Sequence, residues 1–179
     1  MDLVLSGPIP INVAAAALHR LRADVGDIEF GYRAQAWFAH VLKRIGATVV
    51  EIRHQGHPDI IAVLNGRFAR FEIEIASKGD RHHTIKSDDL SAISPVKPGE
   101  LGYLAVLDMA EPMRWATLEQ SRIRGRLGRA PISTLHAVAD RELTKLCNDA
   151  FFELVGESID RLPALTFRLL CDRVLRDNQ

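Results

Sequence analysis

The sequence predicts an α/β fold, because stretches with amphipathic helical spacing alternate with short strand patterns along its 179 residues. Three observations carry this prediction: an apolar stripe at helical spacing from Phe30 to Ile45, a hairpin signal at Asn65-Gly66, and a nearly continuous apolar run from Leu101 to Met109. With 47% hydrophobic and 26% charged residues, the chain has enough apolar material for one compact domain with a sizeable core.

Two helices are expected before the first strand. Asn12 can cap a short helix that runs through Arg22. The second helix ends before Gly46, which stands where a glycine commonly follows a helix with positive φ. Its buried stripe is expected to comprise Phe30, Ala34, Trp37, Phe38, Val41, Leu42 and Ile45.

The strands follow in a regular order. Thr48 to Arg53 is rich in β-branched residues and predicts a strand, and the Asn65-Gly66 hairpin supplies two more. Ser87 is expected to cap a short helix. The apolar run from 101 to 109 predicts a buried strand, and Arg114 to Leu118 a short one after it.

The chain is predicted to have three parts. Residues 1–25 form an N-terminal helical extension, 26–120 the core, and 121–179 a C-terminal segment whose spacing is helical to the end. The apolar stripes of that last segment are explained by packing on the core, or alternatively by a dimer interface.

Three carboxylates are expected to lie close together in the hairpin of residues 56–78. A two-residue type I′ turn at Asn65-Gly66 sets a register in which Asp59 lies opposite Glu72, and strand alternation puts Glu74 on the same face. Opposed residues on one face have Cβ atoms about 4.5 to 5.5 Å apart, and like charges so placed destabilise a sheet. We therefore expect another group, or the solvent, to offset the repulsion between these carboxylates.

The residues alone leave three explanations of this cluster open. A hard divalent cation with oxygen ligands would offset the repulsion. Neutralisation by Arg70 or Arg53 would also do so, and simple exposure to solvent would make it harmless.

Composition limits the classes of function. No apolar run is long enough to span a bilayer, and the start of the chain lacks the pattern of a secretory signal, so we expect no membrane partner. The two cysteines, Cys147 and Cys171, have no CxxC spacing, which indicates reduced, buried thiols in a cytoplasmic protein. Because the formal net charge is zero, any affinity for nucleic acid must come from local basic patches.

Pro58-Asp59 at the start of one strand, followed by Glu72-Ile73-Glu74 on the next, resembles the motif of the PD-(D/E)XK nuclease superfamily. The layout of residues 30–118 is especially similar to Holliday junction resolvases and Mrr-like restriction domains. Glu74 stands where that family usually has lysine. A glutamate that the family often carries on the preceding helix falls on Gln35, counting back from Gly46.

The resemblance implies a restriction-endonuclease-like core, with a central mixed β-sheet flanked by helices, and metal-dependent DNA endonuclease activity. Asp59 and Glu72 would be the ligands of Mg²⁺ or Mn²⁺, with the Ile73 carbonyl as a possible third. Glu74 could accept a proton from the attacking water or hold a second cation. Gln35 could orient a water-ligated ion, or simply flank a buried face. The implied partners are duplex or branched DNA and a second copy of the chain. A nuclease-fold module without catalysis, which binds or assembles, is the alternative.

Several basic residues are candidates for DNA contact. Lys78, Arg81 and Lys86 follow the hairpin and could reach backbone phosphates. Arg122 and Arg124 belong to an arginine and glycine segment, SRIRGRLGR, that suits phosphate contact as well as it suits a solvated connection between helices.

The histidines near these candidates have simpler explanations. The hairpin register puts His57 opposite Glu74, where it could hydrogen-bond that carboxylate, bind the ion or be a structural histidine near a strand end. His82 and His83 are expected in a solvated loop.

Overall fold

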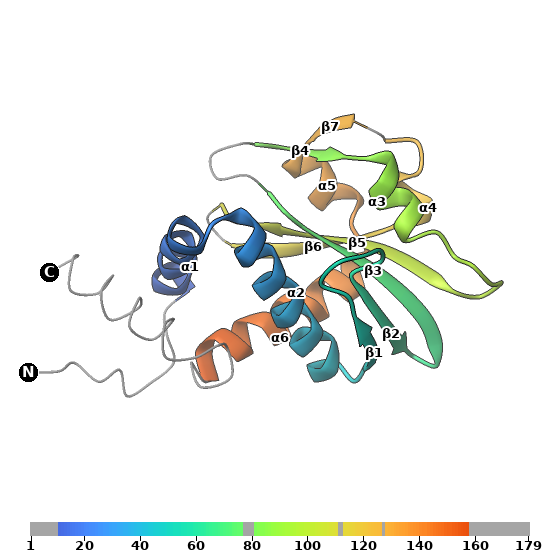
Figure 1. The fold of residues 1–179 in the computed structure, drawn as a ribbon, viewed down its shortest axis with the longest axis horizontal. Helices are drawn as coiled ribbons and strands as arrows, with labels where there is room; N and C mark the ends of the chain where they lie inside the picture. The colour runs from blue at the N-terminus through green and yellow to red at the C-terminus, as the bar shows by residue number, and fades with distance from the viewer. Residues whose placement is uncertain (1–10, 77–80, 111–112, 127, 158–179) are drawn as a thin grey trace, which may run out of the picture.

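A computed structural model describes residues 11–76, 81–110, 113–126 and 128–157 of the chain. It contains a five-stranded sheet of order β1-β2-β3-β5-β6 and a separate two-stranded sheet, β4-β7 (Figure 1). The strands are β1 (Thr48–Ile52), β2 (Ile60–Leu64), β3 (Arg67–Ile75), β4 (His82–Ile85), β5 (Leu101–Asp108), β6 (Arg114–Glu119) and β7 (Gly128–Pro131). The helices are α1 (Ile11–Val25), α2 (Asp27–Arg44), α3 (Ser87–Ala92), α4 (Gln120–Ile123), α5 (Ile132–Val138) and α6 (Arg141–Glu157).

The large sheet is mixed. β3 and β5 pair in parallel, whereas β1 with β2, β2 with β3, and β5 with β6 pair antiparallel. Helices cover both faces of this sheet (Figure 1). The protein is therefore α/β with a central mixed sheet flanked by helices, as expected.

The two faces of the sheet bury different clusters. Along β5, Tyr103 and Ala105 belong to a cluster shared with α1, α2 and α6, while Leu104 and Val106 belong to a cluster shared with α3, α4 and α5. This alternation is the strand periodicity of two, with both faces buried. The β4-β7 sheet lies on the side of α3 and α5 (Figure 1).

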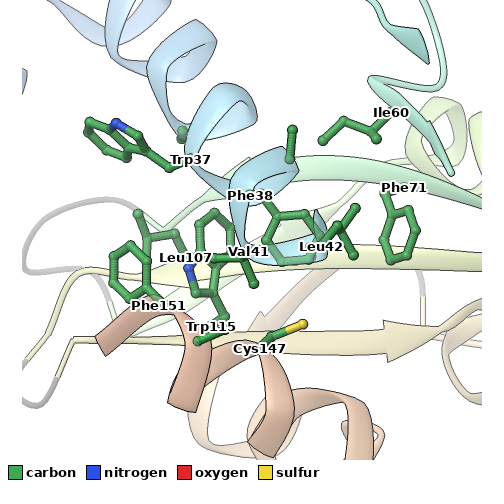
Figure 2. Packing of buried hydrophobic residues seen from close by; sticks show 14 of the residues in the cluster. Trp37, Phe38, Val41, Leu42, Ile60, Phe71, Leu107, Trp115, Cys147 and Phe151 are labelled. Carbon is green, nitrogen blue, oxygen red and sulfur yellow. The ribbon is translucent and has the colours of Figure 1, made fainter. Parts of the chain in front are cut away.

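Aromatic side chains dominate the first cluster. The ring of Phe38 on α2 lies 5.6 Å from the ring of Phe71 and 4.7 Å from that of Trp115, centroid to centroid. Figure 2 shows these side chains between α2 and α6, together with Phe151 and Cys147. Cys147 is buried as predicted; the second cysteine lies outside the described residues.

Two turn predictions are confirmed. After α2, Gly46 has a φ of +89° and the Ala47 N–H donates to the Leu42 carbonyl, closing the helix as a glycine C′ residue does. In the hairpin, Asn65 and Gly66 have φ values of +50° and +74°, the positive values that a type I′ turn requires. The hairpin register of the sequence analysis rests on this turn.

A close backbone contact seats α3 on the sheet. A Cβ atom on Gly102 of β5 would lie 1.8 Å from the Ile93 carbonyl oxygen at the end of α3, so only glycine fits there. At the other end of α3 the N-cap residue is Lys86, one residue before the predicted Ser87. The Asp89 carboxylate caps the helix instead, accepting the Lys86 N–H at 2.9 Å. Together these contacts fix where Lys86 and Asp89 lie.

Besides the cap at Ser87, three predictions of secondary structure are wrong. α1 begins at Ile11, so Asn12 lies inside its first turn rather than before it. The segment from Ser121 is not continuously helical, because β7 separates α4 from α5. His82 and His83 lie in β4 rather than in a loop. β4 and β7 are four residues each and pair across more than 40 positions of the sequence, so periodicity gives little signal for either.

The second apolar stripe of the C-terminal segment, from Leu165 to Val174, lies outside the described residues. Among the helices that the structure describes, none is long and apolar enough to cross a membrane.

Candidate active site

The hairpin brings Asp59 and Glu72 together as predicted. The β2-β3 ladder runs from the turn to the pair Ile60 and Phe71, so Asp59 and Glu72 follow as the next opposed residues. The Asp59 Oδ2 atom accepts the Ile73 N–H at 2.8 Å, which extends the contact of the two segments past the ladder. Both carboxylates are buried, with 7% of Asp59 and 3% of Glu72 exposed.

Asp59 is held by two donors. Its Oδ1 atom accepts the side-chain amide of Gln35 on α2 at 2.7 Å, and its Oδ2 atom accepts the Ile73 N–H. Burial raises the pKa of Asp59 to about 6, although the hydrogen bond from Ile73 opposes the rise. The structure therefore joins Gln35 to the site as a direct partner of Asp59.

Glu72 has one engaged oxygen and one without a partner. Its Oε1 atom lies 2.6 Å from His57 Nδ1, while its Oε2 atom is buried and has no hydrogen-bond partner among the described residues. Burial and the neighbouring Asp59 charge raise the pKa of Glu72 to about 7, although His57 opposes the rise. Burying a carboxylate oxygen without a hydrogen-bond donor costs free energy. A cation or a solvent molecule bound to Glu72 Oε2 would offset that cost.

His57 contacts a different carboxylate from the one predicted. The extrapolated register put it opposite Glu74, but β2 begins at Ile60 and the preceding residues leave the ladder. The neighbouring Gly56 has a φ of +140°, which a strand does not use. The Glu72 carboxylate raises the pKa of His57.

Glu74 has a lysine beside it. The Nζ atom of Lys86, which follows β4 and stands at the N-cap position of α3, lies 3.7 Å from Glu74 Oε1. Burial and the charge of Asp89 raise the pKa of Glu74, whereas Lys86 opposes the rise. Lys86, predicted as a phosphate contact, therefore has its ammonium group beside the Glu74 carboxylate.

Two of the three explanations of the carboxylate cluster fail. Arg70 pairs with Glu100 at 3.3 Å and Arg53 pairs with Glu51 at 2.8 Å, so these arginines are engaged elsewhere. Exposure fails as well, because Asp59 and Glu72 are buried.

The oxygen donors at this position fit a hard divalent cation. Asp59 and Glu72 are the residues that would hold it, and the unpartnered Glu72 Oε2 is the atom most suited to do so. Within the described ranges no three Asp, Glu, His or Cys side chains converge as a preformed metal cage. Backbone oxygen, solvent or substrate oxygen would therefore complete the coordination, as is usual for Mg²⁺.

One residue of this region, Asp89, was missed by the sequence analysis, and another, His83, was misplaced. Asp89 is buried, with 3% exposed, and its charge acts on Glu74, Asp59 and His57. His83 is also buried rather than solvated; burial lowers its pKa, and its Nε2 atom has no partner among the described residues. The signal for Asp89 was an acidic residue three positions after the N-cap, which is typical of a capping box.

The remaining DNA-contact candidates are spread more widely. Arg81 is exposed just before β4, and Arg124 is exposed at the end of α4. Arg122 lies 3.9 Å from Glu119 and donates to the Ala139 carbonyl, so it has a structural role as well. Lys78 lies outside the described residues.

Comparisons with known proteins add no relative. No protein-family model matches the chain. Searches of curated proteins and of solved structures likewise find no match.

Proposed function

We propose that the protein is a metal-dependent DNA endonuclease, with Asp59 and Glu72 as the ligands of Mg²⁺ or Mn²⁺. The observation that carries this proposal is the buried Asp59 and Glu72 pair, which has no arginine to neutralise it and leaves Glu72 Oε2 without a partner. Buried carboxylates with raised pKa values beside one another are typical of functional sites rather than of structural ones.

Each side chain has a definite part in the proposed chemistry. When bound, the cation would neutralise charge that builds on the phosphate and lower the pKa of the attacking water. The Gln35 amide and the Ile73 N–H fix the orientation of Asp59. His57 holds one oxygen of Glu72, and the other oxygen, which has no partner among the described residues, would bind the cation.

Glu74 and Lys86 supply the two other groups that the proposed hydrolysis uses, a proton acceptor and a positive charge. Glu74 has a raised pKa and can accept the proton of the water. The ammonium group of Lys86, 3.7 Å from Glu74, supplies positive charge that a carboxylate at position 74 cannot. This pair supports an active enzyme despite the glutamate in the place of the family's lysine.

The resemblance to the restriction-endonuclease-like core is part of the same proposal. The described sheet has a helix before β1, an antiparallel hairpin that carries the motif, and a parallel crossover from β3 to β5 through α3. Those features agree with the expected core. The predicted homodimer and cytoplasmic location stay predictions.

The test incubates the purified protein with supercoiled plasmid, linear duplex and four-way junction DNA, with Mg²⁺, with Mn²⁺ or with EDTA. We expect cleavage of at least one substrate with a divalent cation, none with EDTA, and none by Asp59→Asn or Glu72→Gln. Glu29→Gln, which alters an exposed carboxylate on α2, is the matched control and should cleave as the parent does.

Two outcomes oppose the proposal. DNA binding without cleavage under every condition would favour the alternative, a nuclease-fold binding or assembly module. Cleavage that survives Glu72→Gln would show that the activity belongs elsewhere.

A further inference from the structure

The β4-β7 ribbon presents one polar face. In its antiparallel register Thr84 lies opposite Arg129 and His82 lies opposite Pro131. Because side chains alternate along a strand, these four residues share one face of the ribbon, and His83 and Ile85 share the other.

The other face is anchored in the protein. Ile85 is 1% exposed and belongs to the cluster that α3, α4 and α5 build on the sheet, and His83 is buried as well. The Ile132 N–H donates to the Arg81 carbonyl at 2.8 Å, which continues the pairing one step beyond β4. The inner face of the ribbon is therefore packed against the protein, whereas Thr84 and Arg129 on the outer face are exposed.

Positive charge is concentrated around this ribbon although the whole chain is neutral. Residues 81–89 and 124–131 contain two acidic residues, of which Asp89 is buried as the cap of α3. The basic residues of these segments are Arg81, Lys86, Arg124, Arg126 and Arg129, all exposed.

The ribbon is continuous with the candidate active site. Lys86 directly follows β4, and its ammonium group lies at Glu74. A polymer that follows the outer face of the ribbon toward this end of β4 would therefore arrive at the carboxylates.

We propose that the outer face of the β4-β7 ribbon binds duplex DNA and delivers the backbone to the Asp59 and Glu72 site. A two-stranded ribbon fits the major groove in width, and arginine forks at its rim match phosphate oxygens. On this account Arg129 contacts a phosphate from the outer face, Arg81 does so from the end of the ribbon just before β4, and Thr84, opposite Arg129, lies against the groove. The inference rests on the proposed function, since it takes DNA as the substrate.

The test measures binding of a fluorescent duplex of about 25 base pairs in EDTA, over a range of salt concentrations, for the parent and for Arg81→Ala/Arg129→Ala. We expect the double variant to lose at least tenfold in affinity. The slope of log K against log salt should fall by about 1.8, because each lost phosphate contact removes about 0.9. Arg81→Lys/Arg129→Lys should keep most of the slope, since it retains both charges.

A matched control removes two exposed charges from the opposite side of the sheet. Lys43→Ala/Lys145→Ala alters α2 and α6, and should leave both affinity and slope unchanged. Thr84→Glu adds a negative charge to the outer face without truncating the ribbon, and should weaken binding even if the arginine variant does not fold.

The outcomes separate this inference from the proposed function. If the parent cleaves DNA but the ribbon variants bind as tightly as the parent, the inference is wrong and the nuclease proposal stands. If the parent never cleaves but loses binding with the ribbon variants, the inference stands and the nuclease proposal fails. No binding of duplex by the parent at low salt overturns the inference.

Discussion

The ammonium group of Lys86 lies 3.7 Å from the carboxylate of Glu74, although the two residues belong to different elements and neither sequence spacing nor strand register joins them. Lys86 follows β4 and Glu74 lies near the end of β3. The contact gives Glu74 a positively charged partner from outside β3.

The first prediction concerns Lys86. Lys86→Met should lower the rate of DNA cleavage about 100-fold, because removal of one preorganised cation at a reacting phosphate has that order of effect. It should not weaken Mn²⁺ binding, because it removes a positive charge from the neighbourhood of the carboxylates. The measurement is single-turnover cleavage with saturating protein, with Lys97→Met, an exposed lysine after α3, as the control.

A rescue variant separates chemistry from structure at this position. Lys86→Arg keeps a positive charge beside Glu74 without removing that carboxylate, and should retain more activity than Lys86→Met. Equal inactivity of Lys86→Arg and Lys86→Met, both folded, would assign Lys86 a structural role only.

The second prediction concerns pH and stability without divalent cations. Burial raises the pKa of Glu72 from its ordinary 4.5 to about 7, so the folded protein holds this proton more tightly than the unfolded chain does. The free energy of unfolding should therefore fall as the pH rises from about 4.5 to 7, and stay level above that range. The groups that face Glu72 are Asp59, which adds to the effect, and His57, which opposes it.

Glu72→Gln should remove most of the fall in the free energy of unfolding with rising pH. We expect the variant to be more stable than the parent by about 1 to 3 kcal/mol at pH 8 and similar to it at pH 5, since one pKa unit corresponds to 1.36 kcal/mol. Urea unfolding of both proteins in EDTA at pH 5, 6, 7 and 8 measures this difference in stability. Identical profiles for variant and parent would mean that Glu72 is not an unfavourable buried charge.

The third prediction concerns the packing of α3 against β5 at Gly102. Gly102→Ala should destabilise the protein by about 2 kcal/mol or more, because its Cβ atom would overlap the backbone at Ile93 and push α3 away from the sheet. Gly31→Ala in α2 meets no atom within 4 Å and should stabilise the protein by about 0.5 to 1 kcal/mol. Opposite signs for the same substitution, measured by thermal unfolding, test the packing directly.

The fourth prediction concerns Gln35, the partner of Asp59. Gln35→Glu adds a third carboxylate beside the pair, so it should lower stability in EDTA and raise the affinity for Mg²⁺ or Mn²⁺. Gln35→Ala should weaken cation binding, because Asp59 loses the donor that orients it. A calorimetric titration that ranks the three proteins in any other order would argue against a cation between these side chains.

The pairing of Asp59 with Glu72 could be predicted from sequence because a two-residue turn with two positive φ values leaves one register open. The predicted register is correct for the residues of the β2-β3 ladder and for the Asp59 and Glu72 pair directly beyond it. It failed at His57, where the chain leaves the strand and a count of residues no longer gives a position.

The contributions of α3 and the ribbon could not be predicted in the same way. Lys86 and Asp89 reach the site because α3 packs on β5 at Gly102, which is a tertiary contact with no local pattern. β4 and β7 are short and form only by pairing with each other. Arginines, glycines and histidines dominate their sequences, and such residues are as typical of loops.

The most direct measurement of the central claim is Mn²⁺ binding, followed by electron paramagnetic resonance at pH 8, for the parent, Asp59→Asn, Glu72→Gln and Glu29→Gln. The account predicts that the parent and Glu29→Gln bind Mn²⁺ specifically, and that both site variants lose this binding while they remain folded. Equal Mn²⁺ binding by all four proteins, or none by the parent at millimolar concentration, would contradict it.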